Sequence, residues 1–181
     1  MTQHKLKFTV NDYMTAPPDK RFQLLDGEMI LVPSPTNRYQ TTLRELALQV
    51  HQFVSRNGLG QVWFAPLDVV LSGYDVVQPD LLYVSNERSI IITDANIQGA
   101  PDLMVEVLSP GTAEYNRGYK RTLYGLSGIP EYWLVDLEAS TVEVLTARNQ
   151  ELVTETTYGR GDTLRSALLP GLSVDLEQIF G

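Results

Sequence analysis

Glu106 is the residue whose position most clearly suggests chemistry. It stands inside an otherwise apolar run, LMVEVL at residues 103–108, which predicts a buried strand. Side chains alternate along a strand, so Glu106 shares a face with Met104 and Leu108. An ionised carboxylate in such surroundings costs roughly several kcal/mol of desolvation unless a partner compensates it. That partner can be a protein cation, in a structural ion pair, or a bound metal ion, and both alternatives stay open.

A second carboxylate, Asp80, follows Pro79 at the head of another apolar segment. Taken alone, the pair Pro-Asp is a common turn dipeptide. Pro79 also suits the start of a strand, because proline has a fixed φ and no N–H to donate. If the strands that carry Asp80 and Glu106 are neighbours, the two carboxylates meet at one end of a sheet, where two acids can share a divalent ion.

The helix expected after the Glu106 strand carries the densest group of cations in the chain. Arg117, Lys120, Arg121 and Tyr124 are three and four residues apart, so they are predicted to form one stripe on that helix. A solvated helix face is one interpretation of this stripe. Its direct connection to the Glu106 strand favours a functional role.

Composition limits the kind of metal site. The chain has no cysteine, and His4 and His51 are its only histidines, so a zinc site built on His and Cys is almost excluded. A bound metal must therefore have oxygen ligands, which points to Mg²⁺ or Mn²⁺. The lack of cysteine also fits a reducing cytoplasm.

Charge and hydropathy limit the partners. The net charge of −8 argues against avid, non-specific binding to nucleic acid, but it does not exclude a nuclease, of which only one face must be basic. No apolar run approaches the ~18 residues of a membrane span, and no apolar stretch of a secretory signal follows Met1. We therefore expect a cytoplasmic protein without a membrane partner.

The first half of the chain has clear local signals. Thr9 is a helix N-cap, and Ala16-Pro17-Pro18 ends that short helix. Asp26-Gly27 predicts a hairpin turn between strands at residues 22–25 and 29–32. A long amphipathic helix is predicted over residues 38–54. Its apolar stripe is Leu43, Leu46, Ala47, Val50 and Val54.

The second half is rich in strands. Strands are predicted at residues 61–66, 68–71, 78–84, 103–108 and 131–135, with a hairpin of residues 141–146 and 151–157, and helices from Thr112 to about Leu126 and over residues 174–180. Residues 85–99 are expected to be a loop with a short element at 90–92. Because strands and helices alternate, we predict an α/β fold with one central mixed sheet flanked by helices and an additional β-hairpin region, in a single domain of residues 1–181.

Several segments together resemble the Uma2 family of endonuclease-like proteins, within the PD-(D/E)xK superfamily. They occur in the same order and cover nearly the whole chain. They are FQLLDGE at 22–28, PSP at 33–35, VQPD at 77–80, PDLMVEVLSP at 101–110, Lys120 with Tyr124, EYWLVD at 131–136 and LPGL at 169–172.

The resemblance implies a restriction endonuclease-like fold and hydrolysis of phosphodiester bonds, with DNA as the expected substrate. It implies that Asp80 and Glu106 bind Mg²⁺ or Mn²⁺, with the backbone carbonyl of Val107 as a further ligand. It also implies a helix-borne catalytic lysine, which corresponds to Lys120 here. The cations Arg117 and Arg121 would then contact the phosphate backbone.

The chain departs from the family pattern at three positions. The ordinary motif places its lysine two residues after the Glu, where this chain has Leu108, so Lys120 must reach back from the helix. Gln23 stands where the family commonly has Glu, and Tyr39 where relatives often have His. These departures leave open an alternative, an inactive binding or interaction module that keeps the endonuclease fold.

Other assignments also have two alternatives. Glu28 is either a distal acid of the site or a polar hairpin residue, and Asp102 is either a strand-entry residue or an outer partner of the metal ligands. A hydrolase that uses two carboxylates as acid and base, without a metal, is a second rival function. No aromatic stacking platform or helix-turn-helix stands out. A homodimer is possible through apolar side chains of the outer hairpin, expected to be exposed: Val142, Val144 and Leu145.

Overall fold

The computed structural model describes residues 6–17 and 21–181. Helix α1 (Val10–Met14) begins at Thr9, whose side chain forms a capping box with Asp12, as predicted. Strands β1 (Phe22–Leu25) and β2 (Glu28–Leu31) form the expected hairpin. Asp26 and Gly27 both have positive φ, at 49° and 76°, as a two-residue hairpin turn requires. Pro18, the last residue of the predicted helix stop, lies outside the described residues.

The structure has two main sheets, where the sequence predicted one. The smaller has the strand order β2-β1-β5-β4-β7, with β4 at Val69–Ser72, β5 at Asp75–Val77 and β7 at Ile97–Gln98. The strand predicted at residues 78–84 is β6 (Leu81–Ser85), which begins three residues later than predicted, and β5 was not predicted. Val77 ends β5 in this sheet, whereas Leu81 begins β6 in the other. The break falls at Pro79, which has no N–H to continue a ladder.

The larger sheet is the mixed sheet expected for an α/β fold. Its strand order is β11-β10-β9-β8-β6-β3, in which only the β8–β9 pair is parallel. These strands are β3 (Gly60–Phe64), β6 (Leu81–Ser85), β8 (Leu103–Val107), β9 (Glu131–Asp136), β10 (Thr141–Arg148) and β11 (Glu151–Gly159). The 3₁₀ helix η1 (Asn86–Ile91) follows β6, and β12 (Thr163–Leu164) pairs with β13 (Val174–Asp175).

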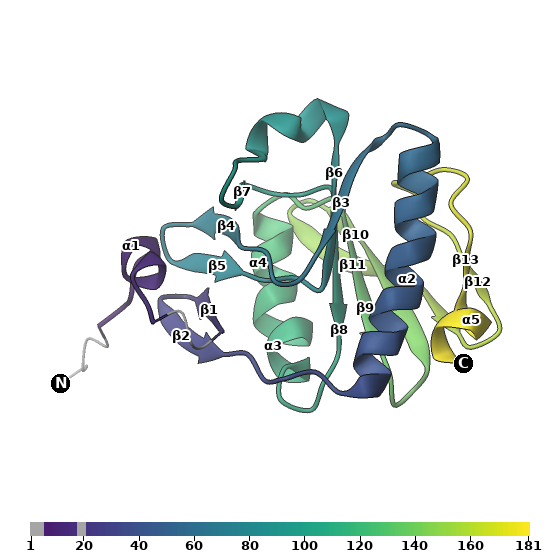
Figure 1. Ribbon diagram of the computed structural model, residues 1–181, viewed down its shortest axis with the longest axis horizontal. Helices are drawn as coiled ribbons and strands as arrows, with labels where there is room; N and C mark the ends of the chain where they lie inside the picture. Colours follow the sequence, from purple (N-terminus) through teal and green to yellow (C-terminus); the bar gives the residue numbers. More distant parts are fainter. Residues whose placement is uncertain (1–5, 18–20) are drawn as a thin grey trace.

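Helices cover both faces of the larger sheet (Figure 1). Helix α2 (Asn37–Arg56) packs on one face through Leu43, Leu46, Val50 and Val54, the stripe predicted from the sequence, beside the terminal helix α5 (Leu176–Phe180). Over residues 6–17 and 21–181, no helix is long and apolar enough to span a membrane.

The opposite face is covered by one continuous helical segment. It consists of α3 (Ala113–Tyr115), the π-helical turn η2 (Asn116–Lys120) and α4 (Arg121–Leu126). Thr112 stands at the predicted N-cap position, but its side chain makes no capping hydrogen bond. Its Oγ1 lies 2.8 Å from Ser109 Oγ instead, which ties the helix start to the loop after β8.

The outer hairpin is not the exposed apolar surface that the sequence suggested. Val142 and Leu145 are fully buried and Val144 is 3% exposed. Val142 and Val144 pack into the core on the α2 side of the sheet, and Leu145 packs into the core on the α4 side. Strand β10 also lies between β9 and β11, so both of its edges are paired. With its edges paired and its apolar side chains in the core, the proposed surface for a homodimer was wrong.

Candidate active site

Asp80 lies where the chain crosses from the smaller sheet to the larger one. Its N–H donates to Val105 O (3.0 Å), and its carbonyl accepts from Ala65 N (3.1 Å). These bonds hold the backbone of Asp80 between β3 and β8, since β6 pairs with both strands. The prediction that the strands carrying Asp80 and Glu106 are neighbours in one sheet is therefore confirmed.

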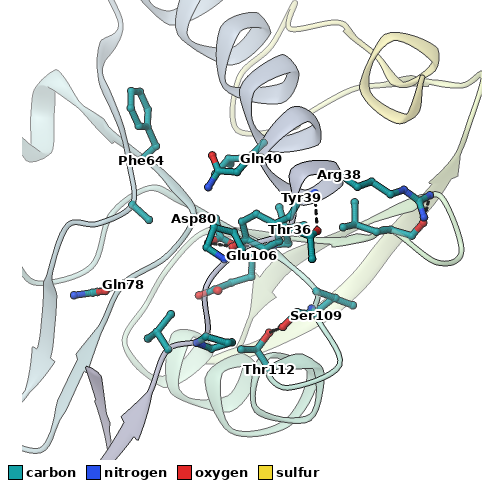
Figure 2. A pocket seen from close by; sticks show the side chains of 18 of the residues that line it. Thr36, Arg38, Tyr39, Gln40, Phe64, Gln78, Asp80, Glu106, Ser109 and Thr112 are labelled. Carbon is teal, nitrogen blue, oxygen red and sulfur yellow. Dashed lines mark hydrogen bonds between the residues drawn. The ribbon is translucent and has the colours of Figure 1, made fainter. Parts of the chain in front are cut away.

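Both oxygens of the Asp80 carboxylate accept hydrogen bonds. Oδ2 accepts from the backbone N–H of Val107 at 2.6 Å, and Oδ1 accepts from the phenol of Tyr39. The residue is only 7% exposed, and it lines the cleft between α2 and the loop after β8. Figure 2 shows Asp80, Tyr39 and Glu106 gathered on the floor of this cleft.

Glu106 is 4% exposed and is bound on one side only. Its Oε1 accepts from Lys120 Nζ at 2.7 Å and from the Tyr124 phenol at 2.8 Å. No described residue donates a hydrogen bond to Oε2, and Glu106 lines the same cleft as Asp80. One carboxylate oxygen is thus held by the protein, while the other keeps its capacity to accept or to bind a cation.

Lys120 reaches Glu106 from the helical segment on the α4 side of the sheet. Asn116, Lys120 and Tyr124, four residues apart, are buried together and form the inward stripe of that segment. The single stripe predicted with Arg117 and Arg121 was wrong. Lys120 and Tyr124 turn inward, whereas Arg117 and Arg121 turn toward Glu143 on β10.

The two carboxylates repel each other. Burial, followed by the negative charge of Glu106, raises the pKa of Asp80 to about 7, although the hydrogen bonds from Tyr39 and Val107 and the charge of Lys120 act in the opposite direction. Burial and the charge of Asp80 also raise the pKa of Tyr39, so its phenol stays protonated and remains a donor. A cation between Asp80 and Glu106 would relieve this repulsion.

The cleft above the carboxylates has a volume of about 1190 Å³ and a partly basic lining. Four carboxylates line this cleft, those of Asp80, Glu106, Asp136 and Glu138. Although the whole chain has a net charge of −8, five arginine or lysine side chains line it as well. They come from separate segments, which is why the sequence did not reveal them as a group. They are Arg21, Arg38, Arg44, Arg117 and Lys120.

Comparison with known proteins assigns the chain to a family. The family model Uma2, described as a putative restriction endonuclease, matches residues 10–177. The chain belongs to the Uma2 family. The family description indicates a nuclease, a hydrolase of phosphodiester bonds whose substrate is a nucleic acid. No curated protein matches the chain.

A solved structure shows the same fold as this Uma2 chain. It is a putative nuclease of the DUF820 group from Anabaena variabilis ATCC 29413, 18% identical, with a TM-score of 0.79 over 96% of this chain and 97% of that chain. At this identity the likeness establishes the fold alone. The predicted restriction endonuclease-like α/β fold is confirmed.

Three of the residues selected from the sequence lie outside the cleft of this Uma2 chain. Glu28 is exposed on β2 and does not line the cleft. Asp102 precedes β8, at the end opposite Val107, where it accepts from Ser85 N (2.7 Å) and pairs with Arg88 Nε (3.3 Å). Arg121 donates to Leu152 O at 3.0 and 2.8 Å. Asp102 and Arg121 therefore have structural contacts away from Asp80 and Glu106.

Two contacts at the site were not foreseen from the sequence. Tyr39 was noted only as a departure from the family pattern, yet its phenol binds Asp80 directly. Gln23 lines the cleft, and its Oε1 accepts from the backbone N–H of Gln78 at 3.1 Å, two residues before Asp80. The sequence marked these two residues only by their places, Tyr39 after the PSP turn and Gln23 before the DG hairpin. Such a place in the sequence does not specify which residue a side chain contacts.

Proposed function

We propose that this Uma2 protein is a divalent-metal-dependent endonuclease that cleaves DNA, with Asp80 and Glu106 as metal ligands. One observation carries the proposal. Two buried carboxylates stand together on the floor of a cleft, and the cation that the protein supplies, Lys120, contacts only one oxygen of Glu106. The pKa of Asp80 is raised by burial first and by the charge of Glu106 second, so a proton or a cation is favoured at this carboxylate.

The donor set fits Mg²⁺ or Mn²⁺. Among the residues the structure describes, no group of three or more His, Cys, Asp or Glu side chains could hold a metal. Mg²⁺ does not require such a group, because it is usually bound by one or two carboxylates together with water and substrate phosphate. Asp80 and Glu106 meet this requirement, and the backbone carbonyl of Val107 is proposed as a further ligand.

The protein's own groups have distinct roles in this mechanism. When bound, the metal would polarise the scissile phosphate and lower the pKa of a water molecule. Lys120 orients the attacking water or stabilises negative charge that develops on the phosphoryl oxygens. Tyr124 holds Glu106 Oε1 in place, and the protonated phenol of Tyr39 fixes the orientation of the Asp80 carboxylate.

The basic side chains of the cleft position the substrate. Arg38 and Arg44 on α2 and Arg117 on η2 line the cleft, so they are the candidates for contacts with phosphates of the substrate. Arg117 would have to exchange its pairs with Asp136 (3.0 Å) and Glu143 (3.1 Å) for such a contact. Such contacts fix orientation and carry no sequence information. No contact with DNA is proposed for Arg121, because it does not line the cleft and its guanidinium donates to the Leu152 carbonyl.

Cleavage of DNA tests this function. The unmodified protein is incubated with supercoiled plasmid and with linear duplex and single-stranded DNA, in Mg²⁺, in Mn²⁺ and in EDTA. We expect metal-dependent cleavage that falls at least about 100-fold in Asp80→Ala, since even loss of an outer partner of a metal ligand costs 10- to 100-fold. The matched control is Asp94→Ala, which removes an exposed loop carboxylate.

The rival functions predict different results. If the unmodified protein cleaves none of several DNA and RNA substrates in either metal, the inactive binding module is the better account. If hydrolysis persists in EDTA and calorimetry detects no Mn²⁺ binding, a metal-free mechanism with two carboxylates replaces the proposed one.

A further inference from the structure

Phe64 is an exposed aromatic side chain in the cleft. It is the last residue of β3, it is 60% exposed, and it lines the same cleft as Asp80. Val62, two residues earlier, is on the same face of the strand and packs against the core beneath α2. The alternation that buries Val62 thus brings Phe64 to the α2 side of the sheet, where it borders open space.

The strand register places the backbone of Phe64 next to the segment that carries Asp80. Phe64 pairs with Leu81, and the next residue, Ala65, donates to the carbonyl of Asp80 at 3.1 Å. The position of Phe64 is therefore set by the same backbone ladder that holds Asp80. Figure 2 shows its ring away from the carboxylate floor, with Gln40 of α2 between the two.

The helix opposite Phe64 offers a mixed wall. Gln40, Arg44 and Leu48 are four residues apart, so they follow one another along one face of α2, and all three line the cleft. This wall combines an amide, a guanidinium and an apolar side chain that is 46% exposed. Between it and Phe64 the cleft offers an aromatic face, a cation and hydrogen-bonding groups.

We propose that Phe64 stacks on the base of an unpaired nucleotide, which makes single-stranded nucleic acid the preferred substrate of this cleft. The inference rests on the proposed function, in which Asp80 and Glu106 act on the scissile phosphate. The stacked base would belong to a nucleotide adjacent to that phosphate. Aromatic rings beside a basic groove are the usual means of holding single strands, since every base has a face that can stack. In an intact duplex the bases are already paired and stacked, so Phe64 has no base to receive.

A single exposed apolar side chain is ordinary on a protein surface. Phe64 differs because it shares a cleft with Arg44 and Arg38 and lies one residue from a contact with Asp80. Strand β3 is also the edge of the larger sheet, so a second copy of the chain is the competing occupant. Arg38 and Arg44, the cations of α2 that line the cleft with Phe64, favour a polyanion over a second copy of an acidic chain.

The test compares binding of two oligonucleotides that differ only in their bases. A 15-residue thymidine strand and a strand of abasic sites of the same length are titrated without metal, in the Asp80→Asn background, which removes one carboxylate charge and prevents cleavage. With Phe64 present, we expect the thymidine strand to bind roughly 5- to 100-fold more tightly than the abasic strand. Phe64→Leu should remove most of this difference and leave abasic binding unchanged.

Phe8→Leu is the matched control, because Phe8 is 49% exposed and does not line the cleft. It should leave both affinities unchanged. Equal binding of the thymidine strand by the Phe64→Leu variant and its parent would overturn the proposal. Dimerisation at micromolar concentration that Phe64→Leu abolishes, with unchanged oligonucleotide binding, would assign Phe64 to a second copy and would also overturn it.

Cleavage is measured separately, so that the two proposals fail independently. Metal-dependent cleavage that Phe64→Leu does not alter, on single strands or on duplex, would contradict the inference and leave the nuclease function intact. Base-dependent binding that requires Phe64, in a protein without any cleavage activity, would support the stacking contact and contradict the nuclease function.

Discussion

Lys120 Nζ lies 2.7 Å from Glu106 Oε1, with both side chains buried, although Leu108 occupies the position where the ordinary motif has its lysine. The cation therefore comes from the helical segment that packs on the sheet, not from the Glu106 strand itself, and it still reaches the Glu106 carboxylate. The contact is a structural ion pair and also places an ammonium group within the candidate active site. The two interpretations left open by the sequence are compatible, because one contact serves both.

Loss of Lys120 should destabilise the fold strongly. Lys120→Met keeps an unbranched side chain but leaves Glu106 buried without a cation. We expect the free energy of unfolding to fall by about 3–5 kcal/mol at pH 8, as for other buried pairs that lose one partner. Urea denaturation measures the change.

Arg148→Gln provides the control for this measurement. It breaks the Arg148–Glu155 pair, whose side chains are 61% and 46% exposed, and it should cost at most about 1 kcal/mol. If Lys120→Met is no more destabilising than Arg148→Gln, the Lys120–Glu106 pair is not the buried interaction described above.

Asp80→Asn should stabilise the metal-free protein while it abolishes metal binding. The substitution removes a buried charge that Glu106 repels. The amide can accept from Val107 N–H and donate to the Tyr39 oxygen, so neither hydrogen-bonding position is lost. We expect a higher melting temperature at pH 8 in EDTA, by an amount that corresponds to a few kcal/mol at most. A lower melting temperature would contradict the assigned repulsion.

The stability of the unmodified, metal-free protein should fall as pH rises from about 4 to about 7. The pKa of Asp80 is raised from 3.8 to about 7 in the folded state, so the folded protein binds more protons than the unfolded chain within this window. The change of unfolding free energy with pH is proportional to the number of protons bound by the unfolded state minus the number bound by the folded state. This difference is negative here, so stability decreases as pH rises. Urea midpoints at several pH values measure the effect, and the contribution should disappear in Asp80→Asn.

The same protonation should oppose metal binding. Below pH 7 a proton competes with the cation for Asp80, so the affinity for Mn²⁺ should fall as the pH is lowered from 8 to 6. Isothermal titration calorimetry at each pH gives the dissociation constant. An affinity that does not change across this range would show that Asp80 does not exchange a proton for the metal.

The packing of α4 on the outer hairpin depends on Gly125. A Cβ at this position would lie 2.7 Å from Gln150 O and 3.2 Å from Leu152 N, both backbone atoms that cannot move freely. Gly125→Ala should therefore destabilise the protein in spite of the better helix propensity of alanine.

Gly118→Ala is the matched control, because it lies in the same helical segment and a Cβ there would meet no atom within 4 Å. It should be neutral or stabilising by up to about 1 kcal/mol. Thermal denaturation of both variants separates packing from propensity. If the two substitutions have the same effect, close packing at Gly125 is not the cause.

Local signals in the sequence were sufficient for most helices and strands. The capping box at Thr9 and the turn at Asp26-Gly27 depend on neighbouring residues, and both were predicted. The division into two sheets was not, because no strand was predicted at Asp75–Val77, the strand β5 that belongs to the smaller sheet. That residues 1–181 form one domain in the cytoplasm stays a prediction.

The candidate site was predictable where two residues were linked by adjacent strands. The meeting of Asp80 and Glu106 followed from one strand pairing, and the approach of Lys120 followed from the family pattern. The basic lining was not predictable, because Arg21, Arg44 and Arg117 come from distant segments and meet only in the folded chain. The exposure of Phe64 also depends on tertiary structure. Phe64 is on the same strand face as Val62, which packs against the core, so the sequence alone would suggest that Phe64 is buried as well.

The most direct test of the account is anomalous diffraction from a crystal of the protein soaked in Mn²⁺ at pH 8. The account predicts one strong anomalous peak between Asp80 and Glu106, about 2.0–2.3 Å from a carboxylate oxygen of each residue, with Lys120 still bound to Glu106. Peaks only elsewhere, or none at a concentration that saturates Mn²⁺ binding in solution, would contradict the assignment of Asp80 and Glu106 as metal ligands.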